Sequence, residues 1–144
     1  MAKRLCVLGA TGSIGASTLD LVRSHPEQFE IHSLSGHRQV DSLAAIANEF
    51  RPRRIALGDS QSAAQLQSQL CYSAEVLSGP QALVTLAEDP QVDTVMAAIV
   101  GAAGLPSTLA AAAAGKTIAL ANLWTDPLFH PKHRWDTGAI DISI

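Results

Sequence analysis

Short apolar runs alternate with amphipathic segments along the first 120 residues. The run at 5–8 is too short for a helix and is ended by Gly9, which indicates a buried strand. Segment 40–50 instead places apolar residues three and four positions apart, as in a helix that covers a core. The predicted strands are 5–8, 29–34, 54–57, 74–77, 92–100 and 117–121, and the predicted helices are 13–23, 40–50, 60–70, 80–87 and 105–114.

This alternation predicts an α/β fold, because strands separated by helices of about ten residues form crossover units with a mostly parallel sheet. We expect a Rossmann-like, doubly wound domain over 1–122, with helices on both faces of the sheet. The composition changes after Asn122, since 123–135 contains both tryptophans and follows neither period. Segment 139–144 alternates like a half-buried strand, so we expect 123–144 to be an irregular tail of an incomplete chain.

A glycine-rich loop follows the first predicted strand and opens the first predicted helix, with glycines at Gly9, Gly12 and Gly15. Gly9 permits a tight turn, Gly12 lets the backbone approach a pyrophosphate, and Gly15 lets the helix pack closely on the sheet. The N–H groups of the first helical turn then face the anion, and Thr11 and Ser13 add hydroxyl donors. The alternative is a glycine-rich turn that binds no ligand.

The end of the second strand predicts which dinucleotide would bind. NAD sites usually carry an acid there to bind the ribose 2′-hydroxyl, but no acid follows this strand before Asp41, and Glu30 lies at its other end. Arg38 instead offers a planar set of donors for a 2′-phosphate, with Ser35 and His37 beside it. The pattern therefore favours NADP over NAD, against the alternative of an exposed loop arginine.

Two further features lie later in the chain. Small residues in 97–104 follow an apolar strand, where they either let a ribose or nicotinamide come close or simply form a tight turn. Asn122 ends the last strand of the domain, where its amide can bond a ribose or a carboxamide. His130 and His133 form an H-x-x-H pair without further ligands at a supporting spacing, so we predict no metal site.

Composition and charge exclude several classes of protein. The net charge of −3 lacks the basic excess typical of nucleic-acid binders. No apolar stretch reaches the roughly 18 residues of a membrane span, and the amino-terminal run is too short for a signal peptide. Cys6 and Cys71 match no metal-ligand or redox spacing, and Cys6 lies in an apolar run, which indicates a reduced core residue and a cytoplasmic protein.

Four segments in order resemble one enzyme family. The run at 8–20, the His-Pro-Glu-Gln-Phe run at 25–29, and the segments 96–109 and 115–122 are similar to 1-deoxy-D-xylulose 5-phosphate reductoisomerase over almost all of 4–122. The resemblance implies an NADPH-dependent enzyme of non-mevalonate isoprenoid biosynthesis. Such an enzyme isomerises its sugar phosphate with Mg or Mn, and reduces the product to 2-C-methyl-D-erythritol 4-phosphate. Members are typically homodimers.

The resemblance also implies which residues bind the cofactor. The matching positions are Thr11, Gly12, Ser13, Ile14, His37, Arg38, Gln39 and Asn122. The first four would contact the phosphates, and the next three would lie near the adenosine ribose phosphate, where His37 replaces a glycine of the family. Asn122 matches an asparagine that contacts the cofactor.

The chain departs from the family after Asn122, where Leu-Trp-Thr at 123–125 replaces Lys-Glu-Ser. The metal-binding Asp-Ser-Glu stretch and the later domains are also missing, while 130–143 weakly resembles a later part of the family sequence. We therefore expect the cofactor-binding part of the enzyme without its catalytic and metal-binding residues, followed by a remnant of the catalytic domain. The alternatives are a non-catalytic NADP(H)-binding module or a degenerate remnant.

Overall fold

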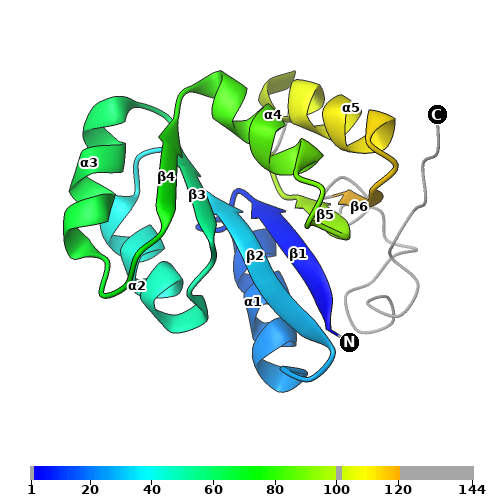
Figure 1. Cartoon of the computed structure of the whole chain (residues 1–144), viewed down its shortest axis with the longest axis horizontal. Helices are drawn as coiled ribbons and strands as arrows, with labels where there is room; N and C mark the ends of the chain where they lie inside the picture. The colour runs from blue at the N-terminus through cyan, green and yellow to red at the C-terminus, as the bar shows by residue number, and fades with distance from the viewer. Residues whose placement is uncertain (1, 100–101, 121–144) are drawn as a thin grey trace.

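A computed structural model of the chain describes residues 2–99 and 102–120, in which strands and helices alternate (Figure 1). The strands are β1 (Lys3–Leu8), β2 (Phe29–Ser35), β3 (Arg54–Leu57), β4 (Glu75–Ser78), β5 (Thr94–Ala97) and β6 (Thr117–Leu120). The helices are α1 (Ser13–Ser24), α2 (Val40–Phe50), α3 (Ser60–Gln69), α4 (Pro80–Glu88) and α5 (Leu105–Ala113), and a short 3-10 turn at Ala102–Gly104 precedes α5.

All the described strands run parallel in one sheet, in the order β4-β3-β2-β1-β5-β6. From β1 the chain moves outward through β2, β3 and β4, and then returns through α4 to β5 on the other side of β1. The connections after β1 and β5 therefore leave in opposite directions. In open α/β sheets, ligands bind at such a switch point, beside the carboxyl ends of the strands.

Two apolar cores lie on the two faces of the sheet, as the helices in Figure 1 indicate. Helices α1, α2 and α3 pack on one face, where Leu5 and Val7 of β1 are buried. Helices α4 and α5 pack on the other face, where Cys6 and Leu8 are buried. Burial on both faces explains why β1 is continuously apolar. The predicted doubly wound fold with helices on both faces is confirmed.

The predicted elements agree with the described ones to within two residues at each end, except at β5, which is shorter than the apolar run at 92–100. Val92 is buried but lies before the strand, where its N–H bonds to the carbonyl of Asp89 (3.0 Å). At the other end, Ala98 makes a last bond to Leu8 (3.0 Å) beyond the end of the strand. The predicted tail at 123–144, with its final strand, lies outside the described residues.

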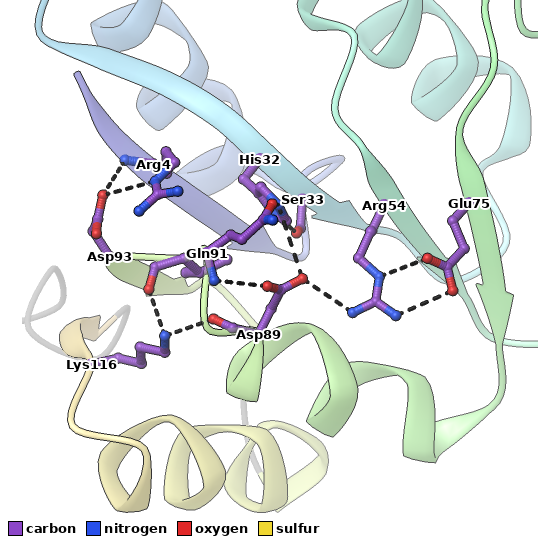
Figure 2. Close-up of polar contacts among 10 residues, drawn as sticks. Arg4, His32, Ser33, Arg54, Glu75, Asp89, Gln91, Asp93 and Lys116 are labelled. Carbon is purple, nitrogen blue, oxygen red and sulfur yellow. Dashed lines mark hydrogen bonds and ion pairs between the residues drawn. The ribbon is translucent and has the colours of Figure 1, made fainter. Parts of the chain in front are cut away.

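Charged side chains join the amino ends of the strands (Figure 2). Arg54 at the start of β3 donates to Glu75 of β4 and to Asp89 at the end of α4. The buried Lys116 donates to the carbonyls of Asp89 and Val92, both at 2.6 Å, and so links α4 and β5 to the start of β6. No helix among the described residues is long and apolar enough to cross a bilayer.

Candidate functional site

The glycine-rich loop connects β1 to α1, and its glycines serve different ends. Gly9 has φ +83°, and a Cβ there would lie 3.0 Å from the carbonyl oxygen of Ala98. A Cβ on Gly15 would lie 2.6 Å from the carbonyl oxygens of Gly9 and Ala10, so only glycine allows α1 to approach the loop. Gly12 is exposed, and a Cβ there would come within 4 Å of no described atom except the Gly9 oxygen, at 3.6 Å. The described residues therefore leave the space beside Gly12 free for a ligand.

The amino terminus of α1 has no side-chain cap. Gly12 is the N-cap residue, and the first turn contains no acidic side chain. The first helical hydrogen bond runs from Ala16 to the carbonyl of Gly12 (2.9 Å), and the N–H groups of Ser13, Ile14 and Gly15 have no partner among the described residues. Unpartnered N–H groups and the helix dipole together favour an anion at this end of α1.

The side chains around this helix end differ in exposure. Ser13 is exposed, whereas Thr11 and Ile14 are half-buried. Ile14 packs against the core under α1. The Ser13 hydroxyl is thus available at the surface, while Ile14 offers its main-chain N–H.

Ser35 joins the ends of β1 and β2. Its hydroxyl accepts a hydrogen bond from the N–H of Gly9 (2.9 Å), and its carbonyl accepts one from Ala10 (2.8 Å). Ser35 is only 1% exposed. Ser35, which the sequence placed beside Arg38, thus lies beneath the glycine-rich loop and fixes the position of that loop.

Three exposed residues follow β2 at the same edge of the sheet: His37, Arg38 and Gln39. Arg38 forms no ion pair with the described residues, whereas Arg4, Arg23 and Arg54 all do. Gln39 precedes the first residue of α2 and accepts a hydrogen bond at its carbonyl from Leu43 (3.0 Å). The guanidinium of Arg38 is thus unpaired among the described residues. It lies three residues after Ser35, whose hydrogen bonds hold the glycine-rich loop.

Asp59 is an acid at this edge that the sequence pattern did not single out. It is the N-cap of α3 and accepts from the N–H of Ser62 (2.7 Å). This hydrogen bond chiefly lowers the pKa of Asp59, and the charge of Arg38 contributes less. The Asp-x-x-Ser spacing at the start of a predicted helix was the available signal. Asp41, the first acid after β2, instead accepts from the Gln69 side chain (3.0 Å).

The remaining candidates have different outcomes. A Cβ on Gly104 would lie 2.8 Å from the carbonyl oxygen of Ile99, so a tight turn accounts for this glycine. Asn122 and the pair His130 and His133 lie outside the described residues. Within the described part, no three His, Cys, Asp or Glu side chains are grouped to hold a metal ion.

Comparisons with known proteins agree with this arrangement. The model of the 1-deoxy-D-xylulose 5-phosphate reductoisomerase family matches residues 5–124. The enzyme of that name from Cupriavidus metallidurans is 55% identical over 123 residues, which are 83% of this chain and 31% of that protein. The chain thus spans about a third of the length of the curated relatives that it matches.

Solved structures match as well. A crystal structure of DOX-P reductoisomerase in complex with NADPH, fosmidomycin and magnesium is 51% identical, with a TM-score of 0.79 over 84% of this chain and 30% of that one. The reductoisomerase from Zymomonas mobilis in complex with NADPH is 41% identical, with a TM-score of 0.80 over 85% of this chain and 32% of that one.

Proposed function

Because the chain belongs to the 1-deoxy-D-xylulose 5-phosphate reductoisomerase family, we propose that residues 1–122 are an NADPH-binding domain, followed at 123–144 by a remnant of the catalytic domain. In the complete enzyme this domain would serve the isomerisation of 1-deoxy-D-xylulose 5-phosphate and its reduction to 2-C-methyl-D-erythritol 4-phosphate. The chain spans 31% of its relative from Cupriavidus metallidurans. We assign to this portion of the enzyme the binding of the coenzyme.

The observation that carries the proposal is the uncapped start of α1 beside the open face of Gly12. The N–H groups of Ser13 and Ile14 would bind the diphosphate of the coenzyme, with the hydroxyls of Thr11 and Ser13 as further donors. Among the described residues, close packing explains the glycines at Gly9 and Gly15 but not the one at Gly12. A ligand that lies against Gly12 would explain why this position has no side chain.

The loop after β2 would bind the phosphorylated ribose of the coenzyme. Arg38 is free to form a bidentate pair with the 2′-phosphate, and His37 and Gln39 flank it. No acid at the end of β2 offers the carboxylate that a 2′-hydroxyl would need. Asn122, which follows β6 in the sequence, would be a further contact of the coenzyme.

The chain's own residues would bind and orient the coenzyme. Once bound, NADPH supplies a hydride for the reduction of a carbonyl carbon. The sequence lacks the Asp-Ser-Glu stretch that the resemblance gives as the metal ligands, so we assign Mg or Mn and the sugar phosphate to other parts of the complete enzyme. The chain by itself is expected to bind NADPH without turning over 1-deoxy-D-xylulose 5-phosphate.

Calorimetric titration of the 144-residue chain with NADPH and NADH tests the proposal. We expect NADPH to bind more tightly, and Arg38→Gln to weaken NADPH alone by about 10- to 100-fold, because hydrogen bonds to charged groups contribute about 1.5–3 kcal/mol. Arg53→Gln is the matched control, since Arg53 is also exposed but lies at the opposite edge, just before β3. Equal affinity for the two coenzymes would refute the proposed selectivity.

A melting curve with and without NADPH separates the alternatives, because a ligand of the native state raises stability. A degenerate remnant would show no shift. A non-catalytic NADP(H)-binding module would show the shift and, unlike a part of the enzyme, would not restore turnover when combined with the missing domains.

We further propose that the protein is cytoplasmic, that it forms homodimers in its complete form, and that it binds neither nucleic acid nor membrane. Cys6 and Cys71 are unpaired, which suits a reducing compartment. Burial raises the pKa of the Cys6 thiol to about 12, so this thiol is an inert core group. The net charge of −3 gives no electrostatic basis for binding phosphate polymers.

A further inference from the structure

Gly58 follows β3 and lies against the His37 ring of the neighbouring loop. A Cβ on Gly58 would clash with Nδ1 of His37, and would lie 2.7 Å from Cε1 and 3.2 Å from the His37 carbonyl oxygen. The N–H of Gly58 donates to that same oxygen (3.2 Å). Gly58 does not have a positive φ. Its backbone conformation therefore tolerates a side chain, and the atoms that a Cβ would meet are those of the His37 ring and carbonyl, so the ring or the loop would have to shift.

The contact fixes the middle of the loop that carries Arg38. The start of this loop is bound to β3 through the N–H of Gly36 and the carbonyl of Ala56 (3.0 Å), and its end leads into α2. Between these points, the His37 carbonyl and ring rest on Gly58. Arg38 is the next residue, and its side chain forms no ion pair among the described residues. Its position therefore depends on the backbone at His37.

The charge of Arg38 also acts on an acidic side chain in the turn after β3. Asp59 directly follows Gly58, and the charge of Arg38 adds to the hydrogen bond from Ser62 in lowering the pKa of Asp59. A shift of the loop away from Gly58 would change where the guanidinium lies relative to this carboxylate. The geometry at Gly58 is thus coupled to the charge that would meet a 2′-phosphate.

We propose that Gly58 is a positioning residue for coenzyme selectivity, because it leaves room for the His37 ring and so holds Arg38 where the 2′-phosphate binds. This inference rests on the proposed binding of NADPH. It makes positions 37 and 58 a coupled pair: a side chain at 58 is tolerated without loss only where position 37 has none. Neither residue needs to touch the phosphate for the pair to act.

The test is a double-mutant cycle in the full 144-residue chain, with NADPH and NADH titrated separately. Gly58→Ala should weaken NADPH by about five- to tenfold, which is part of the loss expected for a displaced charged hydrogen bond, and leave NADH unchanged. In the His37→Gly background, Gly58→Ala should change NADPH affinity by less than about twofold, because the ring is gone and only the milder contact with the carbonyl oxygen of residue 37 (3.2 Å) remains. Ser60→Ala, at an exposed neighbouring position, is the control and should leave both affinities unchanged.

Two results would overturn the inference while the proposed function stands: no change in NADPH affinity for Gly58→Ala, or the same loss with and without His37. Equal losses for NADPH and NADH would also overturn it, since they would indicate general damage to the site. If the unmodified chain binds no NADPH, or binds both coenzymes equally, the proposed function itself fails and the inference fails with it. His37→Gly alters only an exposed side chain, so this arm of the cycle should fold.

Discussion

The amino and carboxyl ends of the parallel strands form two edges of the molecule, which differ in how many of their polar groups have partners. At the amino edge, Arg54 pairs with the carboxylate of Asp89, and Lys116 donates to the carbonyls of Asp89 and Val92 (Figure 2). At the carboxyl edge, the N–H groups at the start of α1 and the guanidinium of Arg38 have no partner among the described residues. Donors without partners are available to a ligand at no cost in broken contacts. The comparison therefore supports the proposal that the carboxyl edge binds the coenzyme, whereas the contacts at the amino edge stabilise the fold.

A bulge in β2 contributes to the hydrogen-bonded contacts of the amino edge. Leu5 of β1 pairs with Ile31, and Cys6 pairs with Ser33, so His32 is an extra residue in β2. Such bulges redirect side chains. The buried His32 ring contacts Gln91 through Nε2 (3.1 Å) and Ser33 through Nδ1 (2.7 Å). No described buried side-chain polar atom lacks a hydrogen-bond partner.

Gly12→Asp should separate coenzyme binding from stability most strongly. Gly12 has φ −83° and ψ 176°, which any residue can adopt, and aspartate is a favoured N-cap. Its charge would repel the diphosphate by about 4 kcal/mol at 4 Å and an effective dielectric constant of 20. We expect NADPH binding to fall by about 100-fold or more in calorimetry, while the melting temperature without ligand stays the same or rises.

Gly12→Asn is the matched control for this change. Asparagine has nearly the same size and caps helices equally well, but it carries no charge. It should retain much more NADPH affinity than Gly12→Asp at the same stability. Equal losses for the two variants would mean that the side chain acts by its bulk, and that the electrostatic account of the α1 terminus is wrong.

Lys116→Met should have the converse effect at the amino edge. The methionine would fill the same space but leave the carbonyls of Asp89 and Val92 without their donor. An unsatisfied buried group costs about 1–3 kcal/mol, which urea unfolding would detect. NADPH affinity should stay within about twofold, given the distance between the edges. Lys3→Met, at an exposed lysine, is the control, and a large loss of NADPH affinity in Lys116→Met would contradict the separation of the edges.

At the carboxyl edge, the positions of the glycine-rich loop and of Arg38 were predictable from the sequence because these parts are local. The glycines at 9, 12 and 15 are adjacent to the strand and helix that give them meaning, and Arg38 follows its strand directly. The bounds of most elements were also predictable, since burial on both faces leaves continuous apolar runs. The strand β5 was the exception. Apolar pattern reports burial rather than sheet hydrogen bonding, and Val92 is buried outside the strand.

The amino edge was not predictable, because its members are distant in sequence. His32 and Asp89 lie 57 residues apart, yet the sheet order brings Nε2 of one within 4.0 Å of a carboxylate oxygen of the other. The same reason hid the contact of Gly58 with His37. A glycine after a strand indicates a turn, whereas its steric role depends on a side chain from another loop.

Acid should weaken the amino edge through Asp89. Burial would raise the pKa of this carboxyl, but the N–H of Gln91 and the charges of His32 and Arg54 outweigh it and lower the pKa below 3.8. The stabilising contribution is therefore present above about pH 4 and is lost as the pH falls through the folded-state pKa. Asp89→Asn should be less stable by about 1 kcal/mol at pH 7, and this deficit should shrink at pH 3. A deficit that is the same at both pH values in urea unfolding would contradict this account.

Arg23→Gln should have the smallest effect, although Arg23 forms more polar contacts than many buried residues. It bonds to both oxygens of Glu49 and to Asp20, and its guanidinium lies 5.1 Å from the centre of the Phe50 ring. Its side chain is 43% exposed, and that of Glu49 is 45% exposed. Water and salt therefore screen the pair, and we expect a loss below about 1 kcal/mol in urea unfolding. A loss as large as that of Lys116→Met would mean that the number of contacts, rather than their burial, makes the amino edge stable.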